Sequence, residues 1–90
     1  MKSQLDAMID LAELFGSKVE VWRLKEGSGH YGVNIADVMQ KDHPKSALIG
    51  SIFGRGERLD EACAHFLNKA RGKLLVKDIG PNERRELVCV

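Results

Sequence analysis

The sequence predicts an α+β fold, in which two helices pack on a largely antiparallel sheet in the order α-β-β-β-α-β-β. Two segments carry apolar residues at helical spacing, one near the start of the chain and one after residue 58. Short runs rich in β-branched and aromatic residues, bounded by glycine-containing turns, lie between and after them. A length of 90 residues supports one hydrophobic core, so residues 1–90 are expected to form a single domain.

The first helix is expected to begin at Ser3. Ser3 and Asp6 have the spacing of a capping box in which aspartate replaces the usual glutamate. Gly16 is expected to end this helix. Its apolar stripe consists of Leu5, Met8, Ile9, Ala12 and Phe15. Its other face carries an acidic stripe, typical of a solvated surface, made of Asp6, Asp10 and Glu13.

Residues 18–25 form the first expected strand, in which the apolar residues change face between Val21 and Trp22. This change predicts either a β-bulge or a strand partly covered on both faces. A hairpin loop at 26–29 then leads into a second strand over 30–36. The residues expected on one face of this second strand are Tyr31, Val33 and Ile35.

Residues 37–45 are expected to form a loop, and residues 46–54 a third strand that is apolar on both faces and therefore central in the sheet. A second helix should end at Gly72, and short strands over 73–77 and 84–90 should complete the fold. The apolar stripe of this helix consists of Leu59, Ala62, Cys63, Phe66, Leu67 and Ala70.

The composition of the chain limits the cellular compartments and the classes of binding partner that are expected. The formal net charge of +1 excludes the strong basic field that draws many domains onto DNA or an anionic membrane. Two cysteines and the lack of a hydrophobic leader indicate a reducing cytoplasm. No apolar run approaches the ~20 residues that span a bilayer, so no membrane partner is expected.

No catalytic arrangement stands out in the sequence. None of the three histidines has a cysteine or carboxylate at a metal-ligand spacing. Cys63 falls within the apolar stripe of the second helix and is expected to be a small buried side chain. We therefore expect a protein that is not an enzyme and that carries no cofactor or metal.

Gly54 and Gly56 precede the second helix and invite comparison with phosphate-binding loops. A dinucleotide fingerprint needs a third glycine where Leu59 stands, and a phosphate-loop ATPase needs a lysine where Glu57 stands. The favoured interpretation is a structural corner between strand and helix. The alternative is an anion site at the helix N-terminus, assisted by Arg55 and Arg58.

Candidate binding residues are one tryptophan and three basic pairs. Trp22 lies either on the less covered face of its strand, as an interface anchor, or beneath the first helix. The basic pairs would share one surface if the last strand lies beside the exit of the second helix, and they are Arg55/Arg58, Arg71/Lys73 and Arg84/Arg85. Opposed by the acidic first helix, such a surface predicts a homo-oligomer or binding to a charged protein.

Residues 56–62, GERLDEA, resemble the G-x-T-L-E-E-A segment of HicB-type antitoxins, with Arg58 where that family places threonine. The expected α-β-β-β-α order of residues 3–72 is similar to that of the double-stranded-RNA-binding domain. That family binds RNA phosphates with lysines at the start of its last helix, and the corresponding positions here hold Arg58, Asp60 and Glu61. These resemblances imply a nucleic-acid-binding or antitoxin-like module as one alternative function.

Three stretches occur together in the C-terminal half: GRGERLDEA at 54–62, RGKLLV at 71–76 and RRE at 84–86. In this combination the C-terminal half is similar to small accessory proteins of bacteriophages. This similarity implies a protein of the bacterial host's cytoplasm that binds and inhibits or modulates a host protein, such as a component of a defence system. A further alternative is an oligomer that sequesters a small anionic nucleotide near Arg55 and Arg58.

Overall fold

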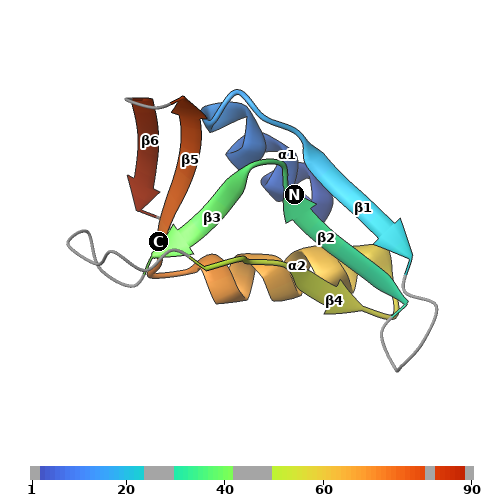
Figure 1. Ribbon diagram of the computed structural model, residues 1–90. Helices are drawn as coiled ribbons and strands as arrows, with labels where there is room; N and C mark the ends of the chain where they lie inside the picture. Colours follow the sequence, from blue (N-terminus) through green and yellow to red (C-terminus); the bar gives the residue numbers. More distant parts are fainter. Residues whose placement is uncertain (1–2, 24–29, 42–49, 81–82, 89–90) are drawn as a thin grey trace.

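The computed structural model describes residues 3–23, 30–41, 50–80 and 83–88 (Figure 1). Within these ranges the α+β class and the antiparallel pairing are confirmed. In chain order the elements are α1 (Gln4–Leu14), β1 (Val19–Arg23), β2 (Tyr31–Ile35), β3 (Val38–Lys41), β4 (Gly54–Gly56), α2 (Leu59–Ala70), β5 (Leu74–Gly80) and β6 (Glu83–Val88).

The strands form two three-stranded sheets rather than one sheet. The first has the order β1-β2-β4 and the second the order β3-β5-β6, and in Figure 1 the β1–β2 and β5–β6 pairs lie on opposite sides of the molecule. The chain passes from the first sheet to the second through Ala36 and Asp37 alone. Asp37 has a φ of 61°, in the left-handed region that aspartate tolerates better than most residues.

The expected third strand is wrong in its bounds and in its position. Of residues 46–54, only Gly54 belongs to a strand in the described part, and β4 lies at the edge of the first sheet, beside β2. Gly50 makes an isolated bridge to Gln40, and residues 42–49 lie outside the described ranges. The buried side chain of Ile52 belongs to the core without being in a strand.

Strand β3 was expected to be part of a loop, and that prediction is also wrong. Its four residues pair with β5 from Val38↔Lys77 to Lys41↔Leu74. The local sequence gives little β signal because half of the strand is Gln40 and Lys41. Pairing with a strand more than thirty residues later in the chain decides its conformation.

Strand β1 pairs with β2 in an unbroken register from Val19↔Ile35 to Arg23↔Tyr31, which rules out the bulge. A strand partly covered on both faces is not what the structure has either, because only Val19 of β1 is half-buried and its other four residues are exposed. As expected, Val33 and Ile35 point into the core from one face of β2, with Tyr31 partly buried beside them.

Helix α1 begins and ends as expected. The Oγ of Ser3 accepts a hydrogen bond of 3.1 Å from the backbone N–H of Asp6. At the other end Gly16 has a φ of 63°, and the N–H of Ser17 donates to the carbonyl of Ala12 at 2.9 Å, the bond that defines a Schellman motif. From β5, the Nζ of Lys77 donates to two carbonyls at this end, where the helix dipole favours a cation.

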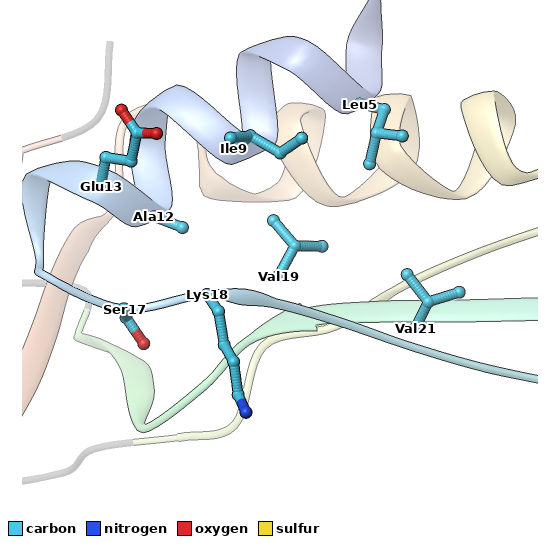
Figure 2. A pocket seen from close by; sticks show the side chains of 8 residues that line it. All are labelled: Leu5, Ile9, Ala12, Glu13, Ser17, Lys18, Val19 and Val21. Carbon is cyan, nitrogen blue, oxygen red and sulfur yellow. The ribbon is translucent and has the colours of Figure 1, made fainter.

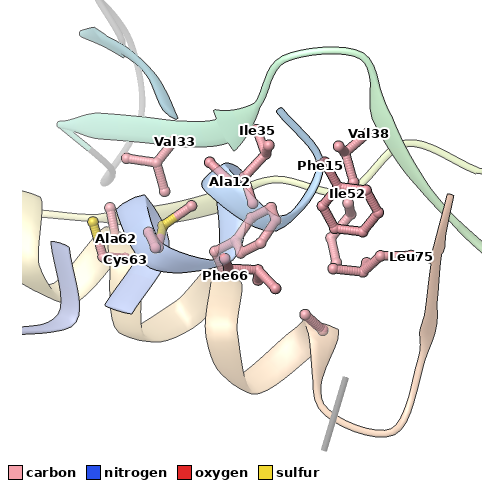
Figure 3. Close-up of a cluster of buried hydrophobic side chains, with 13 residues drawn as sticks. Ala12, Phe15, Val33, Ile35, Val38, Ile52, Ala62, Cys63, Phe66 and Leu75 are labelled. Atoms are coloured by element: carbon pink, nitrogen blue, oxygen red, sulfur yellow. The ribbon is translucent and has the colours of Figure 1, made fainter. Parts of the chain in front are cut away.

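The core lies between the two helices and the inner faces of the sheets (Figure 3). The stripe of α2 is confirmed: Ala62, Cys63, Phe66 and Ala70 are fully buried, and Leu59 and Leu67 are partly buried. In α1, however, the buried residues include Leu11, and Ile9 is 40% exposed. Both residues are apolar, and the packing of α1 against α2 determines which of them faces inward.

Helix α2 begins at an N-cap without a side-chain hydrogen bond among the described residues, because Arg58 occupies that position. We expect Arg58→Ser to raise the free energy of unfolding by about 1 kcal/mol, since it completes a Ser-x-x-Glu capping box with Glu61. Urea denaturation measures the change. Arg58→Ala is the matched control, and an equal gain in that variant would attribute the effect to lost charge instead of capping.

Candidate binding surface

Trp22 lies on the face of the first sheet that is turned away from the helices. It pairs with Gly32, whereas Val21 and Val33 form the neighbouring pair on the helix side. A Cβ atom added to Gly32 would lie 2.3 Å from Cε2 of Trp22, so the indole ring rests directly on the glycine backbone. Trp22 as a whole residue is 36% exposed. Of the two positions expected for Trp22, the less covered face is correct, and the position beneath α1 is wrong.

Phe53 connects Trp22 with two cations. The ring centroids of Trp22 and Phe53 are 6.4 Å apart. The guanidinium carbon of Arg55 lies 5.3 Å from the Phe53 centroid, and the Nζ of Lys69 lies 4.9 Å from it. We call these four residues, contributed by β1, the segment before β4, β4 and α2, the aromatic–cation cluster.

Backbone contacts fix the cluster in place. The Nζ of Lys69 donates a hydrogen bond of 3.0 Å to the carbonyl of Phe53, and the backbone N–H of Arg55 donates to Nδ1 of His65 at the same distance. A cation over an exposed ring gains about 0.5–1 kcal/mol, so Phe53 holds both positive charges beside the indole. The remaining N–H groups of these cations can still bind an anionic or polar partner.

The other predicted basic residues do not join this cluster. Arg58 and Arg71 are exposed at opposite ends of α2, roughly 20 Å apart along a helix of this length. Lys73 follows the exit of α2, at the start of β5. The register places Arg85 opposite Lys77 and Arg84 opposite Asp78, at the far end of β5 from Lys73. Of the predicted basic residues in the described part, only Arg55 therefore contacts the Phe53 ring that lies beside Trp22.

Two members of the cluster were missed in the sequence. Phe53 lies in the segment 46–54 that the sequence predicts as a central strand, and Lys69 is not among the candidate binding residues. A usable signal was the pairing of Trp22 with Gly32, since a glycine directly across a hairpin from a tryptophan leaves room for its ring.

The two glycines of the strand-to-helix corner allow α2 to lie directly on β4. A Cβ atom at Gly54 would be 2.2 Å from the carbonyl oxygen of Ala62 and 2.6 Å from the N of Phe66. At Gly56 it would be 2.6 Å from the N of Ala62. These contacts account for both glycines through packing alone, as the favoured interpretation of this corner requires.

A second surface feature is a groove of about 390 Å³ between α1 and β1 (Figure 2). It is mainly apolar, and two of its side chains are notably exposed for their type, Ile9 at 40% and Val21 at 46%. The residues that line it are Leu5, Ile9, Ala12, Glu13, Ser17, Lys18, Val19 and Val21.

Cys63, on the inner face of α2, is fully buried, as expected. Burial, and to a smaller extent the nearby carboxylate of Asp60, raise the pKa of its thiol. A thiol in this state is a poor nucleophile at neutral pH. The other cysteine, Cys89, lies outside the described residues.

The raised pKa of Cys63 predicts a loss of stability in alkali. The unfolded chain releases the thiol proton at a lower pH than the folded chain, so the free energy of unfolding should fall as pH rises above roughly 8.5. Urea midpoints between pH 7 and 10, measured in a Cys89→Ser background, test this. Cys63→Ala in that background should show a shallower decline, and an identical decline would contradict the prediction.

Comparison with protein-family models, with curated proteins and with solved structures finds no match to this chain. Neither helix in the described part is long and apolar enough to cross a membrane. Among the same residues, no three His, Cys, Asp or Glu side chains are grouped so that they could hold a metal ion. The geometry of the aromatic–cation cluster is therefore the main guide to function.

Proposed function

We propose that this chain is a non-catalytic binding protein that recognises an acidic surface of a partner protein through the aromatic–cation cluster. The observation that carries the proposal is the contact of Arg55 and Lys69 with Phe53, beside the exposed ring of Trp22. Tryptophan and arginine are the residue types most enriched among the energetic centres of protein interfaces. Following the phage-like C-terminal half, the partner would be a protein of a bacterial host.

Charge favours a protein partner over nucleic acid. The cluster contributes two positive charges, and on the same face Glu20 accepts a hydrogen bond of 3.1 Å from the side chain of Asn34. Proteins that bind nucleic acid gain most of their affinity from many phosphate contacts, each neutralised by a lysine or arginine. Two cations beside a carboxylate fit a short acidic segment of a protein better than a continuous phosphate backbone.

The test is affinity purification of the tagged protein from a bacterial lysate, with and without nuclease, read by mass spectrometry. Expected is one host protein that survives nuclease and is lost with Arg55→Glu and with Trp22→Ala. Arg71→Glu is the matched control, because it makes the same charge change at an exposed site outside the cluster. Circular dichroism of each variant establishes that it is folded.

Three outcomes would contradict the proposal. Loss of all partners on nuclease treatment would assign the surface to nucleic acid, and extra small-molecule mass on the bait would assign it to nucleotide sequestration. Equal loss of the partner in the Arg71→Glu control would show that overall charge, and not the cluster, determines binding.

A further inference from the structure

The strand β1 has a free edge among the described residues. It is the outermost strand of its sheet, with β2 as its partner on one side. Just before the first residue of β1, the carbonyl of Lys18 accepts a hydrogen bond of 2.9 Å from the N–H of Ala36. Hydrogen-bonded and non-hydrogen-bonded pairs alternate along an antiparallel ladder, so Glu20 and Trp22 also bond to β2.

The polar backbone groups of the alternate residues must then point the other way. The N–H and C=O groups of Val19, Val21 and Arg23 face the free edge, away from β2. The side chains of Val19 and Val21 project toward α1 (Figure 2). Among the described residues these donors and acceptors have no backbone partner, so the edge offers a row of them beside the apolar groove, the combination that accepts an added strand.

We propose that this edge pairs with the same edge of a second copy of the chain. The two β1 strands run antiparallel about a two-fold axis at Val21. The β1-β2-β4 sheet of one copy then joins the same sheet of the other copy. In this register all five residues of β1 are paired, with Val21 opposite Val21 and Val19 opposite Arg23. The most exposed valine of the edge is then covered at the centre of the contact.

Charge complementarity favours this register over one with the axis at Glu20. Arg23 of the second copy comes opposite Val19 on the groove side, at the end of the groove that Glu13 lines. The two-fold axis repeats this pair, so each groove receives one arginine near one glutamate. A shift to an axis at Glu20 would pair Val19–Val21 alone and set two carboxylates opposite each other, which is unfavourable.

The arrangement also has a geometric consequence for the aromatic–cation cluster. Trp22 lies on the face of the sheet opposite to the groove, so pairing at the edge leaves that face open in both copies. The joined sheet would present two clusters on one face, and a partner with two acidic segments would bind both at once.

Sedimentation equilibrium of the purified chain over a range of concentrations tests the proposal. The wild type should be a dimer. Val21→Pro removes a backbone N–H donor that points away from β2, so β1 should stay paired with β2. The association constant of the dimer should fall by about tenfold or more. Val21→Thr is the matched control, because it keeps the N–H group and the branched shape, and it should remain a dimer.

A charge exchange provides a second test that does not depend on proline. Glu13→Arg and Arg23→Glu should each weaken the dimer, and the double variant should restore it, since it re-forms the pair with the signs reversed. A monomeric wild type at all attainable concentrations would overturn the proposal. So would a dimer insensitive to Val21→Pro, or a double variant no more dimeric than the single ones.

Discussion

Replacing Gly54 by alanine should destabilise the protein more than any other single-methyl addition considered above. The new Cβ atom would lie 2.2 Å from the carbonyl oxygen of Ala62 and 2.6 Å from the N of Phe66, both of which are backbone atoms of α2. A helix backbone cannot rotate away as a side chain can, so the helix itself must move from β4. We expect the free energy of unfolding to fall by about 3 kcal/mol, the upper part of the range for overpacking.

Gly50→Ala is the matched control for this substitution. Among the described residues, a Cβ atom at Gly50 would meet side-chain atoms of Gln40 alone, at 3.9 Å, which is an ordinary contact. Its effect should stay within about 1 kcal/mol, since a compatible backbone gains from the reduced entropy of the unfolded chain. Urea denaturation of both variants measures the difference. Equal effects would show that α2 does not depend on its close approach to β4.

Phe66→Ala should produce the other large loss. Phe66 is fully buried at the centre of the core, between α1 and the two sheets (Figure 3). Truncating a buried phenylalanine costs about 3–5 kcal/mol through lost apolar contact and the cavity that remains. Alanine is the best helix former, so the helix propensity of α2 should not add to the loss.

The matched truncation is Phe53→Ala, which removes the same side chain from a partly exposed site. We expect it to lower the free energy of unfolding by about 1 kcal/mol, less than half of the effect at Phe66. It should also release Arg55 and Lys69 from their common ring and weaken binding of an acidic partner. Comparable losses of stability for the two variants would contradict the assignment of Phe66 as the central core residue.

The helices could be predicted from the sequence because their signals are local and agree with one another. In α1, the cap at Ser3 and the stop at Gly16 bracket a stripe of helical period. In α2, the stripe alone was enough, although Arg58 gives no cap. The hairpin of β1 and β2 was also predictable, since Val33 and Ile35 alternate with residues of the other face.

The missed features all depend on segments far apart in the chain. Strand β3 is stabilised by pairing with β5, and no local pattern in the sequence predicts that pairing. The division into two sheets follows from the same pairing. Within the candidate site, Trp22 and Arg55 were identified from residue type, but the ring that joins them comes from Phe53, thirty-one positions after Trp22. Lys69 contacts that ring from α2.

The short connection through Ala36 and Asp37 has a mechanical consequence. Strands β2 and β3 are consecutive parts of one extended run that bends once, and the bend occupies two residues. A connection this short leaves no slack, so β3 cannot swing away from β2 without breaking its pairing with β5. Force applied to the outer face of the first sheet would therefore reach the second sheet directly through the backbone. The two sheets should then move together, with the angle between them unchanged.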